Sequence, residues 1–190
     1  MKRCSIIVHS VNGNCYIIAN HIKQLLEERN VEARLYRVED PDLHIWANKN
    51  DGTNAYYEEI LSLPLVQPDK LIKSDMIILG CPTIFSNVSA EMKVFMDSTL
   101  DMVQSGELED KLFSCFTSSE YSKFEALGAL DAMQHWAQAQ KLITIPFGKA
   151  GQASGGFCNE GQENITIRPA GEIEQQLEAY ADCLAAFIQD

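Results

Sequence analysis

The sequence predicts an α/β fold, a three-layer sandwich built around a five-stranded parallel sheet. Apolar runs of strand length alternate with helical patterns along the chain, which is typical of consecutive βαβ units. These runs lack strict polar and apolar alternation, as expected for strands that helices cover on both faces. With 190 residues, of which 46% are hydrophobic and 22% charged, we expect a single domain spanning residues 1–190.

Five apolar runs are the predicted strands, and they cover residues 3–8, 31–38, 75–80, 111–117 and 141–147. Helical spacing between and after these runs predicts amphipathic helices that pack on the sheet. Their predicted inward positions are Ile18, Ile22, Leu25 and Leu26; Met92, Phe95 and Met96; Leu127, Leu130 and Met133; and Ile173, Leu177, Tyr180, Leu184 and Phe187. Ser89 is the expected N-cap of the helix in the third unit.

The chain is acidic, with a net charge of −12 from 15 Lys and Arg against 27 Asp and Glu. This balance argues against a nucleic-acid partner and an anionic membrane surface, because both require a basic face. Such acidity usually serves solubility alone, and the alternative is an acidic face for basic redox partners. No apolar stretch has the length of a membrane span or signal peptide, so we expect a cytoplasmic protein.

The cysteines predict buried thiols and no metal centre. None of the six forms a CxxC pair or a Cys/His spacing typical of a metal site. They are Cys4, Cys15, Cys81, Cys115, Cys158 and Cys183.

Two long irregular segments, residues 39–67 and 148–171, do not fit the minimal alternation of strand and helix. Each follows a predicted strand, so each begins at the carboxyl edge of the sheet. Open α/β sheets bind ligands at that edge, and long loops in compact domains are often functional.

The loop after the first strand, in the stretch HSVNGNC, has the chemistry of an anion site. Ser10, Asn12, Asn14 and the Cys15 N–H can surround a phosphate, and Gly13 allows close backbone approach. The loop contains no Lys or Arg and is neither GxGxxG nor a Walker A motif. A simple polar turn with an Asn helix cap is the alternative interpretation.

Two further loops at the same predicted edge are also rich in hydrogen-bonding groups. After the third strand the chain has Pro82, Thr83, Phe85 and Asn87, and after the fourth it has Thr117, Ser118, Ser119 and Tyr121. The alternatives are a helix entry with a buried Phe and a polar turn that caps a helix. Three such loops at one edge favour a ligand site more than each loop does alone.

The sequence resembles a known family in these loops. SVNGNC resembles the FMN-phosphate loop T-x-T-G-N-T of flavodoxins. GCPTIFSNVSAEMKVFMDST resembles the G-[ST]-P-T-x-F-G-N-M segment of the NAD(P)H:quinone oxidoreductases of the tryptophan-repressor-binding-protein type. The resemblance covers nearly the whole chain and is most specific at residues 80–99. It implies a flavodoxin-like sheet of order 2-1-3-4-5, with FMN at the switch point between strands one and three.

Carried over residue by residue, the resemblance implies three groups of FMN contacts. The residues expected to contact the phosphate are Ser10, Asn12, Gly13, Asn14 and Cys15. Those expected at the flavin ring and ribityl chain are Pro82, Thr83, Ile84, Phe85 and Asn87, and those expected on the other side of the ring are Thr117, Ser118, Ser119 and Tyr121. The chain departs from the family at Ile84, Ser86 and Gln140, where the family has Arg, Gly and His. These departures concern the quinone and nicotinamide contacts more than the FMN contacts.

The implied activity is FMN-dependent transfer of electrons from NAD(P)H to quinones or similar small-molecule acceptors. Flavin chemistry requires no protein nucleophile, so no catalytic residue is predicted. His9 and His44 are the nearest titratable candidates, although a local structural role is the alternative for both. Trp46, Tyr56 and Tyr57 are candidates to cap the flavin, against the alternative of a local aromatic cluster.

Two other functions remain open at this point. One is a flavodoxin-type electron carrier that does not react directly with NAD(P)H, and the other is a flavodoxin-like domain that binds no flavin. The resemblance also implies a homo-oligomer, either a dimer or a tetramer.

Overall fold

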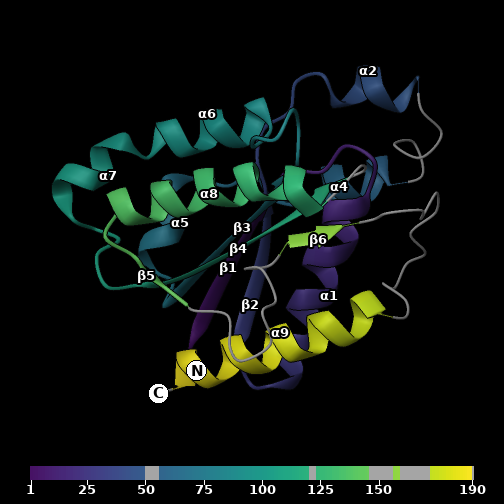
Figure 1. Cartoon of the computed structure of the whole chain (residues 1–190). Coiled ribbons are helices and arrows are strands. Elements are labelled where there is room, and N and C mark those ends of the chain that lie inside the picture. Colours follow the sequence, from purple (N-terminus) through teal and green to yellow (C-terminus); the bar gives the residue numbers. More distant parts are fainter. Residues whose placement is uncertain (50–55, 120–122, 146–155, 159–171, 190) are drawn as a thin grey trace.

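The computed structural model describes residues 1–49, 56–119, 123–145, 156–158 and 172–189, and in these ranges a parallel sheet lies between two helical layers (Figure 1). The strands are β1 (Arg3–Val8), β2 (Glu32–Arg37), β3 (Met76–Pro82), β4 (Leu112–Ser119), β5 (Ile143–Thr144) and β6 (Gly156–Cys158). The strand order is β2-β1-β3-β4-β5, and each described pairing is parallel. The predicted fold class and strand order are therefore confirmed.

The described helices are α1 (Asn14–Glu28), α2 (Leu43–Ala47), α4 (Tyr57–Ser62), α5 (Pro68–Ile72), α6 (Ala90–Ser98), α7 (Leu100–Ser105), α8 (Lys123–Ala139) and α9 (Glu172–Gln189). One hydrophobic cluster packs α1 and α9 against one face of the sheet, and a second packs α5, α6 and α8 against the other (Figure 1). No helix in the described ranges is both long enough and apolar enough to cross a lipid bilayer.

The fifth position of the sheet differs from the prediction. The expected strand at residues 141–147 is described as a strand only at Ile143–Thr144, which pairs with the beginning of β4. The second piece, β6, lies inside the segment predicted as a loop, and it pairs with Thr117–Ser119 at the end of β4. A three-residue strand containing glycine has too little apolar pattern to be recognised in the sequence.

Most predicted inward positions are buried, but two are wrong. Leu127 is 44% exposed and Phe187 is 41% exposed, whereas their neighbours Leu130 and Ile188 are buried. The buried residues described in α8 are Ala126, Ala129, Leu130, Met133, Trp136 and Ala137, and Leu127 lies beside this stripe, so its apolar side chain gave a misleading signal. The side chain of Ile173 lies outside the described residues.

The prediction of buried thiols holds for Cys4, Cys15, Cys81 and Cys115. Cys183 is half-buried, and the side chain of Cys158 lies outside the described residues. Burial raises the pKa of the Cys81 thiol to about 12, even though hydrogen bonds from Ser89 lower it.

Helix α8 approaches the turn that follows β3 at a glycine. A Cβ atom added to Gly128 would lie 1.9 Å from the backbone oxygen of Ser86. Glycine inside a helix costs about 1 kcal/mol relative to alanine. Here the missing side chain allows the turn to lie directly on α8.

We predict that Gly128→Ala lowers the free energy of unfolding measured by urea denaturation. The overlap with the Ser86 backbone oxygen costs about 1–3 kcal/mol, against roughly 1 kcal/mol gained from helix propensity, so we expect a net loss of up to about 2 kcal/mol. Ala132→Gly, four residues further along α8, is the reciprocal control and should lose only about 1 kcal/mol. A Gly128→Ala protein more stable than wild type would show that the turn does not require this close approach.

Candidate functional site

The three loops predicted to form a site meet at the carboxyl edge of the sheet. The His9 N–H donates to the Gly80 oxygen at 2.9 Å, which joins the end of β1 to β3. The Thr83 N–H donates to the Ser118 oxygen at 2.8 Å, which joins the second loop to the third. The Ser118 backbone also hydrogen-bonds the thiol of Cys15, which links the first loop to the third.

The first loop leads directly into α1 at Gly13. Gly13, and not an Asn, is the N-cap residue of the helix, with φ 82°, and the first turn contains no acidic residue. The predicted alternative of an Asn side-chain cap is therefore wrong. The Ser10 hydroxyl accepts a hydrogen bond from the Tyr16 N–H at 3.1 Å, which braces the loop from within. A helix start of this kind presents N–H groups and a partial positive charge.

The other predicted residues of the first loop differ in exposure. Asn12 is exposed, Asn14 is half-buried and Cys15 is buried. Burial raises the pKa of the Cys15 thiol well above its usual range, and the Cys81 thiol raises it further, against a smaller lowering by the Ser118 backbone. Cys15 is therefore a neutral thiol at physiological pH and not a nucleophile.

The second loop is a tight, strained turn. Ile84 and Asn87 exchange backbone hydrogen bonds of 2.9 and 3.0 Å. The two residues between them both have positive φ, 48° at Phe85 and 58° at Ser86. Phe85 is 99% exposed, so the predicted alternative of a buried Phe is wrong. Backbone strain of this kind is most often found at functional sites.

The hydroxyl groups at the base of the second and third loops bond to each other. Thr117 donates to the Cys81 oxygen at 2.7 Å, and its oxygen lies 2.8 Å from the Thr83 hydroxyl, which is therefore the donor of that pair. Pro82 is half-buried, and Ser118 and Ser119 are buried. Tyr121 lies outside the described residues. The two threonines fix the spacing of the two loops.

A buried network centres on His9, directly before the first loop. Its Nε2 lies 3.1 Å from Asp40 Oδ2, and its Nδ1 lies 2.8 Å from the hydroxyl of Ser89. Ser89 also accepts from the Met92 N–H, which confirms it as the N-cap of α6. Burial alone would raise the pKa of Asp40, but His9 and nearby backbone N–H groups bring it below its usual value. The Glu91 carboxylate oxygen Oε2 lies 3.6 Å from Nδ1 of His9.

The aromatic candidates lie at different places. The ring of Tyr56 covers Gly13 in the first loop. Trp46 lies on α2, is 49% exposed and has the Lys49 ammonium 5.8 Å from its ring centre. Tyr57 is half-buried. His44 has a local partner, since its Nδ1 lies 2.9 Å from the Pro41 oxygen.

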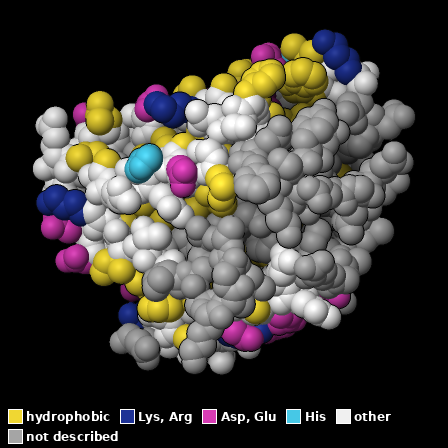
Figure 2. All heavy atoms as spheres, viewed as in Figure 1, with side chains coloured by type: hydrophobic (Ala, Val, Ile, Leu, Met, Phe, Trp, Pro, Cys, Tyr) yellow, Lys and Arg dark blue, Asp and Glu magenta, His cyan; other side chains and the backbone are white. Residues whose placement is uncertain are grey.

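The edge of the site has an apolar border. Figure 2 shows hydrophobic side chains along the upper edge of that view, near α2 and the start of α6. The exposed hydrophobic residues on α2 and on the turn after β3 are Ile45, Trp46, Ile84 and Phe85.

Three positioning features were missed by the sequence reasoning. They are the contact of Tyr56 with Gly13, the bonds of His9 to Asp40 and Ser89, and the contact of Gly128 with the turn. A glycine in the middle of an amphipathic helix was a signal available for the last of these. The other two join residues that are far apart in the sequence, and no local pattern reports them.

Proteins of related sequence are named as quinone-reducing enzymes. An NAD(P)H dehydrogenase (quinone) of Archaeoglobus fulgidus is 33% identical over 120 residues, which cover 63% of each protein. A quinone-oxidoreductase QR2 of Triphysaria versicolor is 30% identical over 155 residues, which cover 75% of this chain and 68% of the relative. The match thus spans less than two thirds of the Archaeoglobus protein.

Solved structures confirm the fold and match it along its whole length. A flavodoxin, WrbA-like protein from Agrobacterium tumefaciens has a TM-score of 0.68 at 18% identity and covers 100% of this chain and 98% of its own. Flavodoxin 1 from Bacillus cereus has a TM-score of 0.64 at 15% identity, with 97% and 98% covered.

The family model described as NADPH-dependent FMN reductase matches residues 5–154, a span that contains all three loops. The chain therefore belongs to the NADPH-dependent FMN reductase family.

Proposed function

We propose that this protein binds FMN at the carboxyl edge of β1, β3 and β4 and transfers electrons from NAD(P)H to quinones or similar acceptors. The main support is that the start of α1 at Gly13, with no acidic residue in its first turn, and the strained turn after β3 lie at one sheet edge in a chain of this family. The quinone-reducing names of the relatives support the acceptor class.

The donor groups of the first loop fit a phosphate. The start of α1 supplies backbone N–H groups, and Gly13 has the positive φ that lets the chain turn around an anion. Ser10 uses its oxygen to accept from Tyr16, so its own O–H can donate to the phosphate. The proposed phosphate contacts are Ser10, Asn12, Gly13, Asn14 and Cys15.

The second and third loops fit a flat ring system. Phe85 and Ile84 are exposed apolar side chains, and the Thr83–Thr117 pair holds their turn beside β4. The proposed ring and ribityl contacts are Pro82, Thr83, Ile84, Phe85, Asn87, Thr117, Ser118, Ser119 and Tyr121.

The chemistry comes from the flavin, which accepts hydride from NAD(P)H and passes electrons to the acceptor when it is bound. The chain binds the cofactor, orients it and shields it from water. The buried thiols of Cys15, Cys81 and Cys115 have raised pKa values, so they remain protonated and take no nucleophilic part. Departure from the family at Ile84 removes a cation from the acceptor side of the ring.

A second candidate function is a flavodoxin-type electron carrier. The net charge of −12 favours docking with a basic redox partner. Stopped-flow mixing of the FMN-loaded protein with NADPH and with NADH separates the two functions. We expect direct bleaching of the flavin absorbance by at least one nucleotide. Absence of bleaching with both would reject the enzyme and require a partner reductase.

We also propose that the protein acts in the cytoplasm as a homo-oligomer, either a dimer or a tetramer. The exposed apolar residues beside the site support self-association, because apolar surface favours protein contacts. Sedimentation velocity measures the assembly directly, and a monomer at micromolar concentration would contradict it.

For Asn14→Asp we predict opposite effects on the apoprotein and on FMN binding. A carboxylate in the first turn of α1 should stabilise the apoprotein by about 0.3–1 kcal/mol through the helix dipole. The same charge repels phosphate and should raise the Kd for FMN roughly tenfold or more. Thermal unfolding of the apoprotein and flavin-fluorescence titration measure the two effects. Unchanged FMN affinity would place the phosphate elsewhere.

For Phe85→Gly we predict higher stability together with weaker FMN binding. A left-handed non-glycine residue costs about 1–2 kcal/mol, and the added flexibility of glycine cancels about 0.5–1 kcal/mol of that gain. Urea denaturation of the apoprotein and FMN titration check both parts. Ser86→Gly is the matched control, because it relieves the same type of strain without removing an aromatic ring. If Phe85→Gly and Ser86→Gly bind FMN equally well, Phe85 does not contact the flavin.

A further inference from the structure

We infer that Tyr56 is a positioning residue for the phosphate loop, holding Gly13 and the start of α1 in the conformation that receives the cofactor phosphate. The inference rests on the proposed function, since it concerns the loop assigned to FMN. It gives Tyr56 a role different from the flavin cap and from the local aromatic cluster that the sequence suggested.

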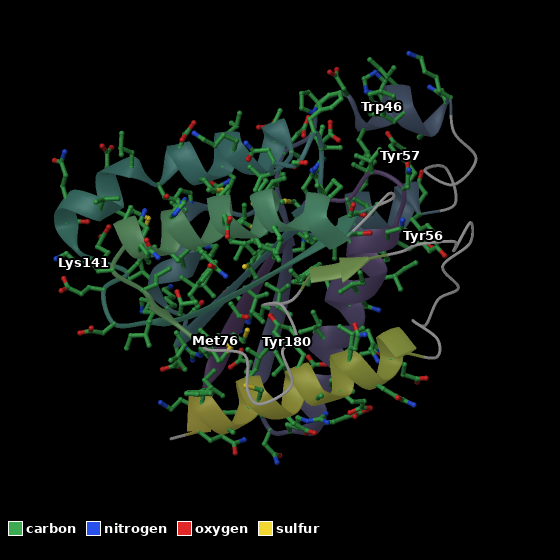
Figure 3. All side chains as sticks on the ribbon, viewed as in Figure 1. Trp46, Tyr56, Tyr57, Met76, Lys141 and Tyr180 are labelled. Carbon is green, nitrogen blue, oxygen red and sulfur yellow. The ribbon has the colours of Figure 1, made fainter. Side chains whose placement is uncertain are left out.

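Tyr56 lies directly against the loop. A Cβ atom added to Gly13 would fall 2.2 Å from Cδ2 of the Tyr56 ring, so the ring occupies the space that a side chain at position 13 would need. The Tyr16 ring lies beside it, with centroids 6.3 Å apart. Figure 3 labels Tyr56 at the end of the molecule where α1 begins. The Gly13 backbone is thus packed under an aromatic ring.

The position of the Tyr56 ring is supported by α4 and by the edge strand β2. Tyr56 precedes α4, and its backbone carbonyl oxygen accepts a hydrogen bond from the Ile60 N–H at 3.0 Å. The Ile60 side chain is buried. The chain then runs beside the edge strand β2, where the Arg37 N–H donates to the Pro64 oxygen at 3.0 Å and Val66 donates back to Arg37 at 2.8 Å. The sheet edge therefore supports the ring through α4.

The same segment also contacts the other end of the loop. Asp40 follows β2 and hydrogen-bonds His9, the residue before Ser10, in a buried site. Residues 9–13 are therefore held at their start by Asp40 and at their end by Tyr56. Two independent contacts from one segment on so short a loop indicate that the segment sets the loop conformation.

The effect of Tyr56 should be specific for the phosphate. The turn beside the flavin ring is joined to β4 by the bond from Thr83 to Ser118 and to α8 at Gly128. The Tyr56 ring instead packs on Gly13 in the first loop. Removal of its ring should therefore weaken binding of FMN while leaving binding of riboflavin, which lacks the phosphate, nearly unchanged.

The test compares FMN and riboflavin by fluorescence titration of the apoprotein. For Tyr56→Ala we expect a Kd for FMN about tenfold higher than wild type and a Kd for riboflavin within roughly twofold. Tyr56→Phe keeps the ring and should bind FMN like wild type. Phe187→Ala, which truncates a partly exposed aromatic on α9, is the control and should leave both affinities unchanged. Thermal unfolding of each apoprotein verifies that it is folded.

Three results would overturn the inference. Equal losses for FMN and riboflavin would show general damage to the fold, and no loss for either would show that the ring does not position the loop. A Tyr56→Phe protein as weak as Tyr56→Ala would assign the effect to the hydroxyl instead of the ring. A wild-type chain that binds riboflavin and FMN equally would contradict the phosphate site itself, and a wild-type chain that binds neither would overturn the proposed function.

Discussion

Parallel pairing of β1, β3 and β4 is the constraint on which the site depends. Val8 pairs with Gly80, and Pro82 pairs with Ser118, so the carboxyl ends of the three strands lie side by side. The loop that follows each of these strands therefore begins at the same edge of the sheet. The chain reverses direction in strand order between β1 and β3, and ligands of open α/β sheets bind at such points.

Close packing against glycine converts this shared edge into a defined geometry. Gly13 lies under Tyr56, Gly80 lies under the ring of Phe116, and Gly128 lies against the turn after β3. At each position a Cβ atom would overlap its neighbour, so the spacing of the loops is set by contact and not by loop length. Hydrogen bonds from the His9 side chain and between the Thr83 and Thr117 hydroxyls fix the relative orientation of the same loops. The strain at Phe85 is tolerated because the surrounding turn is held from several sides.

The sequence was sufficient for the sheet and for the meeting of the three loops at its carboxyl edge, because both follow from local patterns. Apolar runs specify β1 to β4, and polar loops after three of them converge once the strands pair in parallel. It was insufficient where packing decides. Leu127 is exposed although it is as apolar as Leu130, which is buried, and β6 pairs with β4 although its three residues have no strand pattern. The side-chain partners of His9 and the aromatic ring that covers Gly13 come from residues at least thirty positions away in the chain, and no periodicity encodes such contacts.

The central claim is that backbone N–H groups at the start of α1 hold the cofactor phosphate, in a loop whose sequence SVNGNC contains no Lys or Arg. Amide NMR spectra of the apoprotein, titrated separately with FMN and with riboflavin, test this most directly. The account predicts that the resonances of Gly13, Asn14 and Cys15 move downfield with FMN and stay nearly in place with riboflavin. If FMN binds but leaves these three amides unmoved, the phosphate is held elsewhere and the account is wrong.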